Sequence, residues 1–158
     1  MVASFAGRRR AFSLIELVIV VVIIGIIAAI AIPRMSRGSA GASDATLTAN
    51  LKVLRNAIDL FYTEHNNTYP AAATIADQLT LYSDDAGATN ASKSSTFVFG
   101  PYIRAIPALP VGAKKGKSGI AAADAANIGW IYTEADGTIK ANCADGETDA
   151  RGVKYNTY

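Results

Sequence analysis

The chain has 158 residues, of which 51% are hydrophobic, and its formal net charge at pH 7 is +2. This length is enough for one domain with a modest core. Three of the 15 basic residues and none of the 13 acidic ones lie in residues 1–11, so without that segment the side-chain charge is −1. The composition therefore argues against a nucleic-acid partner, and the single Cys143 excludes an intrachain disulfide.

An arginine triplet at residues 8–10 is followed by a long apolar run that ends at Pro33. Glu16 is the only charged residue within that run. As a helix rising about 1.5 Å per residue, residues 14–32 would cover about 28 Å, which is close to the ~30 Å hydrocarbon core of a bilayer. Because arginines favour the cytoplasmic side, the pattern predicts a single membrane pass with a cytoplasmic N-terminus.

Glu16 needs a partner or a function, because a carboxylate in an apolar segment is disfavoured by roughly 2.5–3.5 kcal/mol at the centre of a membrane span and by less near its end. No Lys or Arg follows within one helical turn, and the arginines lie six to eight residues upstream. Glu16 therefore either reaches back toward the arginines or pairs with a cation that the precursor lacks. A new amino terminus formed by cleavage is such a cation.

The order of these residues resembles the class III signal of type IV pilins and of the pseudopilins of type II secretion. It consists of an arginine-rich leader, the small Ala11, then Phe12, with Glu16 fifth when counted from Phe12, and an apolar helix. The resemblance implies that a prepilin peptidase cleaves between Ala11 and Phe12 and N-methylates Phe12. In that family the residue before the cut is usually Gly, and here it is Ala11.

The same resemblance implies how the mature chain assembles. Mature subunits form a homo-oligomeric helical filament whose core contains the stem helices, and an inner-membrane assembly platform and an ATPase drive the process. In that family the glutamate pairs with the amino terminus of a neighbouring subunit, a role that carries over to Glu16. The pairing is physically reasonable, because a lone carboxylate and a lone ammonium are each costly at low dielectric and compensate each other.

Two other interpretations of the N-terminal segment stay open. One is an ordinary secretory signal, with residues 8–10 as its basic region and Ala29-Ile30-Ala31 as its cleavage site. The other is an uncleaved signal anchor. Both leave Glu16 unexplained, which favours the class III signal.

Pro33 predicts the end of a helix or a kink in it, and the family carries a proline at this place within a continuous, bent helix. Residues 36–41 are mostly small and polar, which predicts a weak helix. Further on, apolar residues at alternating steps of four and three predict one face of an amphipathic helix. These residues are Leu47, Leu51, Leu54, Ile58 and Phe61. The simplest interpretation is one stem helix that ends in the turn-rich residues 65–70.

Three segments predict the first part of the globular region. Residues 74–81 predict a short helix that buries its apolar residues, Ile75, Leu79 and Leu81. Residues 83–95 are polar and predict a loop without a core. In residues 97–110, three prolines exclude a long helix or a central strand, so this segment predicts a packed connector that resembles the one in the same family.

Residues 127–142 give the clearest signal for a sheet, an antiparallel hairpin around a Gly-containing turn. Its large apolar residues, Trp130, Tyr132 and Ile139, are expected to be divided between the two faces. The remaining segment, residues 143–158, reads as a solvated polar tail. Its alternate acids Asp145, Glu147 and Asp149 are weaker candidates for calcium ligands, because their spacing is not that of an EF-hand loop and the later glutamate is missing.

The other charged or potentially reactive residues do not indicate a catalytic or binding site. His65 is the only histidine and has no matching arrangement of ligands, so it is interpreted as a surface or capping group. Lys114, Lys115 and Lys117 are interpreted as a solvated loop rather than a site for an acidic partner. No Ser/His/Asp, Cys/His or paired metal-ligand arrangement is evident, so we expect neither an enzyme nor a cofactor.

The sequence thus predicts an α+β, pilin-like fold, in which a long N-terminal stem helix runs from membrane to periplasm and packs against a small antiparallel sheet. Its expected parts are a cleaved leader (1–11), a transmembrane and filament-core half of the stem (12–33), an amphipathic half (34–65) and a small globular domain (66–158). The expected function is that of a structural subunit of a type IV pilus-like filament or a type II secretion pseudopilus. The subunit is expected first in the inner membrane and then in a periplasmic or extracellular filament. The alternative is a membrane-anchored or secreted, non-catalytic binding module that uses the lysine loop or the acidic tail.

Overall fold

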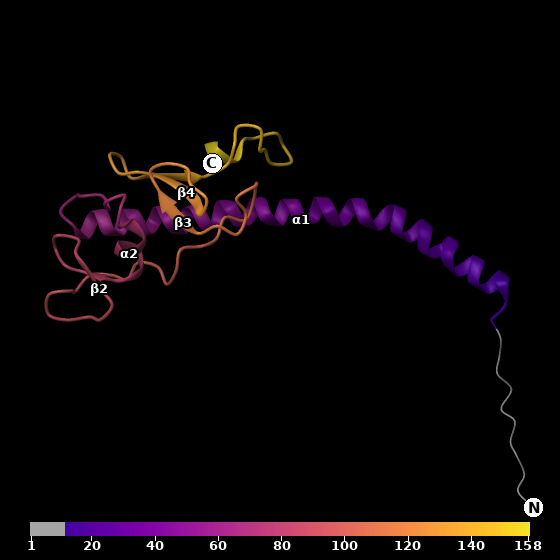
Figure 1. The fold of residues 1–158 in the computed structure, drawn as a ribbon, viewed down its shortest axis with the longest axis horizontal. Helices are drawn as coiled ribbons and strands as arrows, with labels where there is room; N and C mark the ends of the chain where they lie inside the picture. Colours follow the sequence, from indigo (N-terminus) through magenta and orange to yellow (C-terminus); the bar gives the residue numbers. More distant parts are fainter. Residues whose placement is uncertain (1–11) are drawn as a thin grey trace, which may run out of the picture. The chain divides into compact units, whose positions relative to one another are not determined.

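The structure, a computed structural model, describes residues 12–158, and the side chains of all of these except residues 31–39. The elements in chain order are α1 (Leu14–Glu64), α2 (Ile75–Thr80), β1 (Tyr82–Ser83), β2 (Thr89–Asn90), β3 (Gly119–Ala121), β4 (Ile128–Thr133), β5 (Thr138–Ala141) and the 3-10 helix η1 (Tyr155–Thr157). The chain divides into two compact units, with the boundary after Gly38. Figure 1 shows the long helix α1 and the short elements that follow it. The expected α+β arrangement of a long N-terminal helix and small sheets is confirmed.

Helix α1 is a single run of 51 helical residues. It continues through Pro33 and through residues 36–41, where the sequence predicts a weak helix. The kink at Pro33 stays a prediction. Beyond Gly38 the helix belongs to the second unit, which also contains all the other elements.

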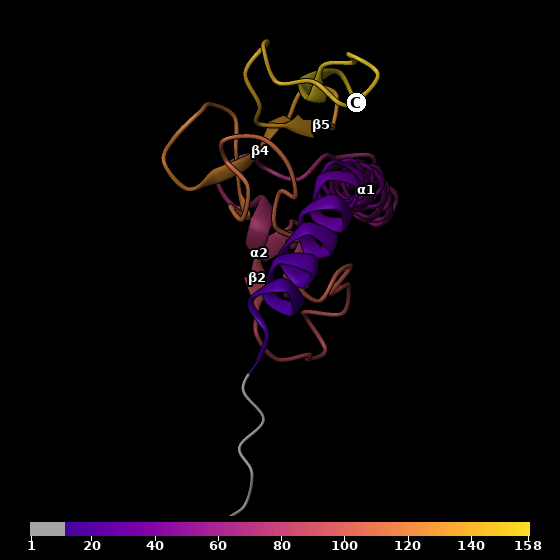
Figure 2. The ribbon, with the colours of Figure 1, turned by 90° about the vertical axis from the view of Figure 1, so that its right-hand side faces the viewer.

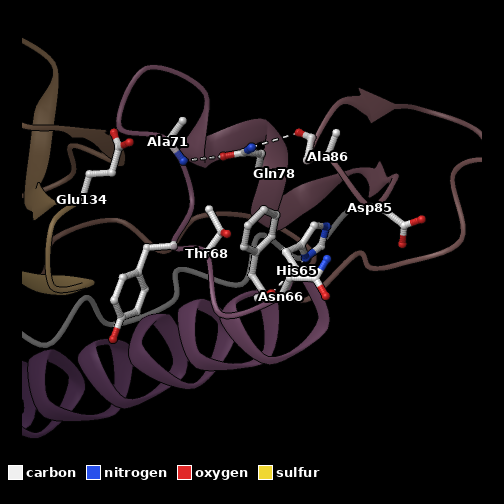
Figure 3. A pocket seen from close by; sticks show the side chains of 11 residues that line it. His65, Asn66, Thr68, Ala71, Gln78, Asp85, Ala86 and Glu134 are labelled. Atoms are coloured by element: carbon white, nitrogen blue, oxygen red, sulfur yellow. Dashed lines mark hydrogen bonds between the residues drawn. The ribbon is translucent and has the colours of Figure 1, made fainter.

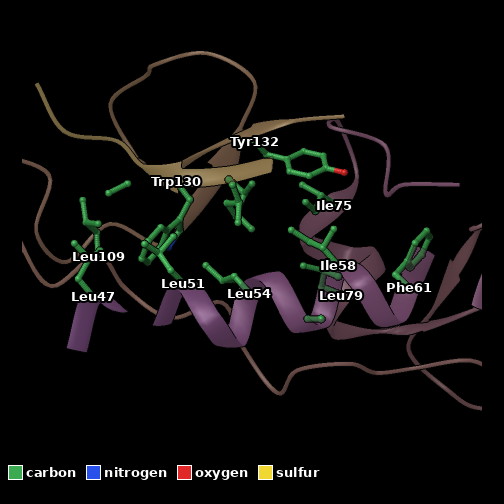
Figure 4. Packing of buried hydrophobic residues seen from close by; sticks show 14 of the residues in the cluster. Leu47, Leu51, Leu54, Ile58, Phe61, Ile75, Leu79, Leu109, Trp130 and Tyr132 are labelled. Carbon is green, nitrogen blue, oxygen red and sulfur yellow. The ribbon is translucent and has the colours of Figure 1, made fainter. Parts of the chain in front are cut away.

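The apolar stripe of α1 forms the centre of the core. Its members are at most 2% exposed: Leu47, Leu51, Leu54, Ile58 and Phe61. Helix α2 adds Ile75 and Leu79, and the connector adds Leu109, all at most 1% exposed. Figure 4 shows these side chains between α1 and the strand that carries Trp130 and Tyr132. Steps of three and four residues keep the stripe on one helix face, so a single face of α1 serves the whole core.

The larger sheet has three strands in the order β3-β4-β5. The predicted hairpin is present as the antiparallel pair β4 and β5. Strand β3, which the sequence analysis does not predict, pairs with β4 in parallel and makes the sheet mixed. Gly129 permits this approach, because a Cβ there would collide with the carbonyl oxygen of Lys117. Figure 2 looks along α1 and shows the hairpin beside the helix.

The large side chains of the hairpin lie on one face of the sheet, so the predicted division between two faces is wrong. Trp130 and Tyr132 are two residues apart, and residues at that spacing in a strand point to the same side. The register places Ile139 opposite Tyr132, and all three side chains are at most 2% exposed. The polar atoms of the two aromatic side chains are hydrogen-bonded. Trp130 Nε1 donates to the carbonyl of Pro107 at 2.8 Å, and the Tyr132 hydroxyl donates to the carbonyl of Pro70 at 2.9 Å.

The loop predicted over residues 83–95 and the surface position predicted for His65 both need correction. Strands β1 and β2 pair within this loop, and Ser83 is fully buried. His65 is 3% exposed and stacks on Phe61 with ring centroids 3.7 Å apart. Its Nδ1 donates to the carbonyl of Phe61 at 2.9 Å, so Nε2 accepts from the hydroxyl of Ser83 at 3.1 Å. Two asparagines with positive φ, Asn66 and Asn67, turn the chain directly after this residue.

The segment predicted to be a solvated tail is folded back on α1. Tyr155 donates its hydroxyl to Asp44 at 2.8 Å, and Arg55 donates to the carbonyl oxygen of Tyr158 at 2.6 Å. The side chain of Asp149 is 1% exposed. It accepts hydrogen bonds from the Tyr158 hydroxyl, from two backbone N–H groups and from the guanidinium of Arg151. The polar residues of this segment therefore make a structural network rather than a solvated surface.

The network predicts a pH dependence of stability. The hydrogen bond from Tyr158, with those from Val153 and Arg151, holds the pKa of Asp149 well below its usual value. A carboxyl whose folded pKa is depressed stabilises the fold fully above its unfolded pKa, about 3.9, and loses that contribution as pH falls toward the folded pKa. We expect Asp149→Asn to lower the urea midpoint of unfolding at pH 7, and the gap to wild type to narrow at pH 3.

Asp145→Asn is the matched control for this prediction. Asp145 also has a lowered pKa, through its hydrogen bond from Asn156 and the charge of Lys154, but its side chain is 79% exposed. We expect this variant to change the midpoint much less, because an exposed pair contributes little. A gap between Asp149→Asn and wild type that is equal at pH 7 and pH 3 would contradict the proposed cause.

Candidate functional site

The first turn of α1 holds the predicted assembly residue, Glu16. The backbone N–H of Ser13, just before the helix, donates to Glu16 Oε2 at 2.9 Å. This is one half of a capping box, in which a glutamate three residues into the helix reaches back to the N–H of the cap residue. The positive end of the helix dipole also favours a carboxylate at this place. The structure thus orients the Glu16 carboxylate toward the N-terminal end of α1.

The capping contact was missed in the sequence analysis although its signal was present. Ser13-Leu14-Ile15-Glu16 has the S-x-x-E spacing that precedes many helices. Glu16 thus has a local structural partner in the backbone N–H of Ser13, and its pairing with a second subunit stays a prediction.

The apolar part of α1 around and beyond Glu16, residues 14–30, is exposed on all sides. Its large apolar side chains are each at least 42% exposed: Leu14, Ile15, Leu17, Val18, Ile19, Val20, Val21, Val22, Ile23, Ile24, Ile26, Ile27 and Ile30. A helix that is apolar all round is stable only where lipid or other protein covers it. Among the described residues, the unit that contains this surface has no other helix or strand, so these side chains are uncovered within it.

A separate test concerns the membrane. Among the described residues, no helix meets the combined requirement of length and hydropathy for a membrane span. The single membrane pass stays a prediction.

The structure describes some of the predicted site residues in full and others only in part or not at all. Phe12 is 83% exposed just before the helix, and Glu16 follows on its first turn. Ala11, on the other side of the predicted cut, lies outside the described residues, as does the rest of the leader. Pro33 is far along α1, and its side chain is not described.

A hollow at the C-terminal end of α1 (Figure 3) has a volume of about 220 Å³. Gln78 bonds to the backbone on two sides of the hollow: it accepts from the N–H of Ala71 at 2.8 Å and donates to the carbonyl of Gly87 at 2.9 Å. Glu134 accepts from the N–H of Ala72 at 2.8 Å. The hollow is smaller than the 300–1,000 Å³ typical of small-molecule sites. We therefore interpret the hollow as a space left where the turn after α1 packs, rather than as a small-molecule site.

The three candidate calcium ligands are not brought together. Asp145 accepts from Asn156, Glu147 accepts from the N–H groups of Ala113 and Ala144, and Asp149 belongs to the network with Tyr158. Within residues 12–158, no group of three or more His, Cys, Asp or Glu side chains is placed to hold a metal ion.

The lysine loop is less solvated than predicted. Lys114 forms an ion pair with Asp124, donates to the carbonyl of Ala125 at 3.0 Å, and its side chain is 25% exposed. Lys117 contacts the side-chain oxygen of Asn127 at 3.4 Å. These contacts tie the loop to the segment before β4, and they do not favour the alternative binding module.

Comparison with known proteins gives a family match at the N-terminal end of the chain. Residues 7–32 match the family model of the prokaryotic N-terminal methylation motif. The match includes Ala11, Phe12 and Glu16 and all of the exposed apolar surface of residues 14–30. No curated protein and no solved structure gives a significant match to the chain.

Proposed function

We propose that this chain, which carries the methylation motif that is the hallmark of type IV pilins and pseudopilins, is the precursor of a filament subunit. The filament is either a type IV pilus-like fibre or a type II secretion pseudopilus. The observation that carries the proposal is the place of the motif, which ends in a helix that is apolar on all sides and has one carboxylate on its first turn. The subunit is structural and needs neither catalysis nor a cofactor.

The first step of the proposed pathway is cleavage by a prepilin peptidase. Hydrolysis of the bond between Ala11 and Phe12 removes the three leader arginines and creates an amino terminus on Phe12. Methylation of that nitrogen keeps its positive charge. The precursor has its N-terminus in the cytoplasm and its apolar helix in the inner membrane, with a periplasmic or extracellular position after assembly.

In the second step, Glu16 of one subunit pairs with the amino terminus of Phe12 of the next. Among the described residues, only Oε2 of Glu16 accepts a hydrogen bond, so Oε1 is open to an ammonium group. The apolar helices cover each other and exclude water, which makes an uncompensated charge costly and the pair specific for one register. An inner-membrane assembly platform and an ATPase supply the driving force.

Intact mass and N-terminal sequencing of the protein from its native membrane test the proposal. We expect a chain that begins with N-methyl-Phe12. A start near Ile32 would indicate an ordinary secretory signal, and an uncut Met1 would indicate a signal anchor; either result contradicts the proposal. Ala11→Gly should be cut as fast as wild type or faster, whereas Ala11→Glu should stay uncut because the small residue before the cut is lost. Normal cutting of Ala11→Glu would place the cleavage elsewhere.

A further inference from the structure

Two segments of the globular unit have the pattern Asn-x-Ser/Thr, the acceptor sequence for N-linked sugars. The first is Asn66-Asn67-Thr68, just after the end of α1, and the second is Asn90-Ala91-Ser92, which begins in β2. The pattern is short and occurs often by chance, so its structural context decides whether it can serve as an acceptor. An acceptor asparagine has to lie on the surface of an exported protein, where a turn or loop presents it.

The first acceptor sequence lies in an exposed turn. Asn66 and Asn67 have φ angles of 51° and 61°, a left-handed conformation in which asparagine is enriched, and the side chains of Asn66 and Thr68 are exposed. The turn is held by its backbone, through bonds from the Asn67 N–H to the carbonyl of Tyr62 at 3.0 Å and from the Thr68 N–H to the carbonyl of His65 at 2.9 Å. Among the described residues, the Asn66 amide and the Thr68 hydroxyl have no hydrogen-bond partner, so both are free to bind an enzyme.

The second acceptor sequence is held more firmly. Asn90 Oδ1 accepts a hydrogen bond from the N–H of Ser92 at 2.8 Å, and the backbone of Asn90 pairs with Tyr82 of β1. A transferase has to draw the acceptor segment into its own groove, so at Asn90 it has to break both the side-chain bond and the strand pairing. At residues 66–68 it breaks only the two backbone bonds of a turn beside a helix end, and helix ends fray. Asn66 is therefore the more accessible acceptor.

We propose that Asn66 is an N-glycosylation site, with Thr68 as the hydroxyl of its acceptor sequence. Glu64 distinguishes this sequence further, because it places an exposed acid two residues before Asn66, which a basic groove on an enzyme would attract. The Asn90 sequence has Ala88 at the corresponding place. From the proposed function, the inference uses only that the globular unit leaves the cytoplasm and so meets a sugar donor on the outer side of the membrane.

The reaction is the transfer of an oligosaccharide from a lipid diphosphate by a membrane-bound transferase. The Asn66 amide nitrogen attacks the anomeric carbon of the sugar, so that a C–N bond forms and the C–O bond to the diphosphate breaks. The lipid diphosphate leaves with the bonding electrons, and the nitrogen gives one proton to a base of the transferase. Nothing is oxidised or reduced.

The folded unit can carry a sugar at this position. Asn66 lies at the edge of the hollow at the end of α1 (Figure 3), and its side chain is exposed. The buried rings of Phe61 and His65 stack on each other and need not move when a group is attached to the neighbouring amide. An N-linked sugar is bulky and strongly hydrated, so it stays at the surface beside the turn.

Peptide mass spectrometry of the chain from its native membrane tests the site. A protease that cuts before aspartate releases residues 59–76 and residues 85–123 as separate peptides, each with one acceptor sequence. We expect the 59–76 peptide to carry an oligosaccharide on Asn66 and the 85–123 peptide to be unmodified. A sugar found only on the 85–123 peptide would overturn the proposal. A chain that begins with N-methyl-Phe12 but has an unmodified 59–76 peptide overturns the glycosylation site and leaves the proposed function standing. A glycosylated chain with another N-terminus supports the site and contradicts the proposed function.

Variants of the turn test the acceptor sequence itself. Asn66→Gln and Thr68→Ala should each reduce the modified 59–76 peptide to background, whereas Thr68→Ser keeps a hydroxyl and should stay modified. Asn67→Gln is the matched control, because Asn67 is also exposed with a positive φ but is not followed by Ser or Thr two residues later, so it should stay modified. Thr68→Ala leaves Asn66 and the backbone bonds of the turn in place, so its loss of sugar does not depend on a folding defect. A sugar that survives Asn66→Gln lies on another residue, such as the Thr68 hydroxyl, and overturns the proposal.

Glu64→Gln tests the acid in front of the site. The variant keeps an oxygen that accepts the hydroxyl of Tyr102, as Glu64 does at 2.6 Å, and removes only the negative charge. We expect a smaller modified share of the peptide that contains Asn66, and an unchanged share would overturn the role given to this charge.

Discussion

Replacing Glu16 by Ala is expected to abolish filaments while leaving membrane insertion and cleavage at Phe12 intact. The substitution removes the only charge of the apolar run, so insertion becomes easier. In the assembled state, however, it leaves the amino terminus of the neighbouring subunit without a counter-ion. Breaking a buried charge pair in this way costs about 3–5 kcal/mol, which weakens each subunit contact by roughly 100-fold or more. Electron microscopy of sheared filaments, with an immunoblot for mature subunit in the membrane fraction, measures both outcomes.

Two further variants separate charge pairing from helix capping. Glu16→Gln keeps an oxygen that accepts the N–H of Ser13 but cannot neutralise an ammonium, so it should fail to assemble like Glu16→Ala. Ser13→Ala is the control: it keeps the charge of Glu16 and the backbone N–H that Glu16 accepts, so it should still form filaments. Normal filaments from Glu16→Gln would mean that capping, rather than charge, is what assembly requires of this residue.

Replacing Trp130 by Ala is expected to lower the free energy of unfolding by about 3–5 kcal/mol, as large-to-small changes of buried aromatic residues do. The side chain is completely buried against the stripe of α1, and its indole N–H donates to Pro107. The loss is a large part of the 5–15 kcal/mol typical of a whole domain. Urea unfolding of the mature chain in detergent, followed by circular dichroism, measures it.

Val98→Ala is the matched control, because Val98 is apolar but 43% exposed and should change the free energy of unfolding by less than about 0.5 kcal/mol. Trp130→Phe keeps most of the buried volume and should fall between the two. A loss of under about 1 kcal/mol for Trp130→Ala would show that the sheet is not held by this contact.

The parts of the fold that follow from short-range periodicity could be predicted from the sequence. The stripe from Leu47 to Phe61 repeats at helical spacing, and the β4–β5 hairpin has two β-prone runs around a glycine turn. At the candidate site, the motif at residues 7–32 is itself a local pattern, so it could be predicted without a structure, with Phe12 and Glu16 as its candidate residues.

The features that could not be predicted depend on contacts far apart in the chain. Strand β3 has only three residues, and it is a strand because β4 lies beside it, where Gly129 lets the backbones approach. His65 is buried because Ser83, 18 residues later, supplies a hydroxyl to its ring. The tail is ordered because Tyr155 reaches Asp44, 111 residues earlier. None of these long-range contacts produces a periodic pattern in the sequence.

The state of Cys143 bears on whether a polymer of this chain can come apart. The chain has a single cysteine, and a reactive thiol on every subunit would join copies covalently in an oxidising compartment. Burial, together with the adjacent carboxylate of Glu147, raises the pKa of Cys143 to about 11. At neutral pH only about one thiol in 10,000 is then ionised, and the thiolate is the form that exchanges disulfides. In the proposed filament we therefore expect the contacts between subunits to be non-covalent, so that a reducing agent leaves the polymer unchanged.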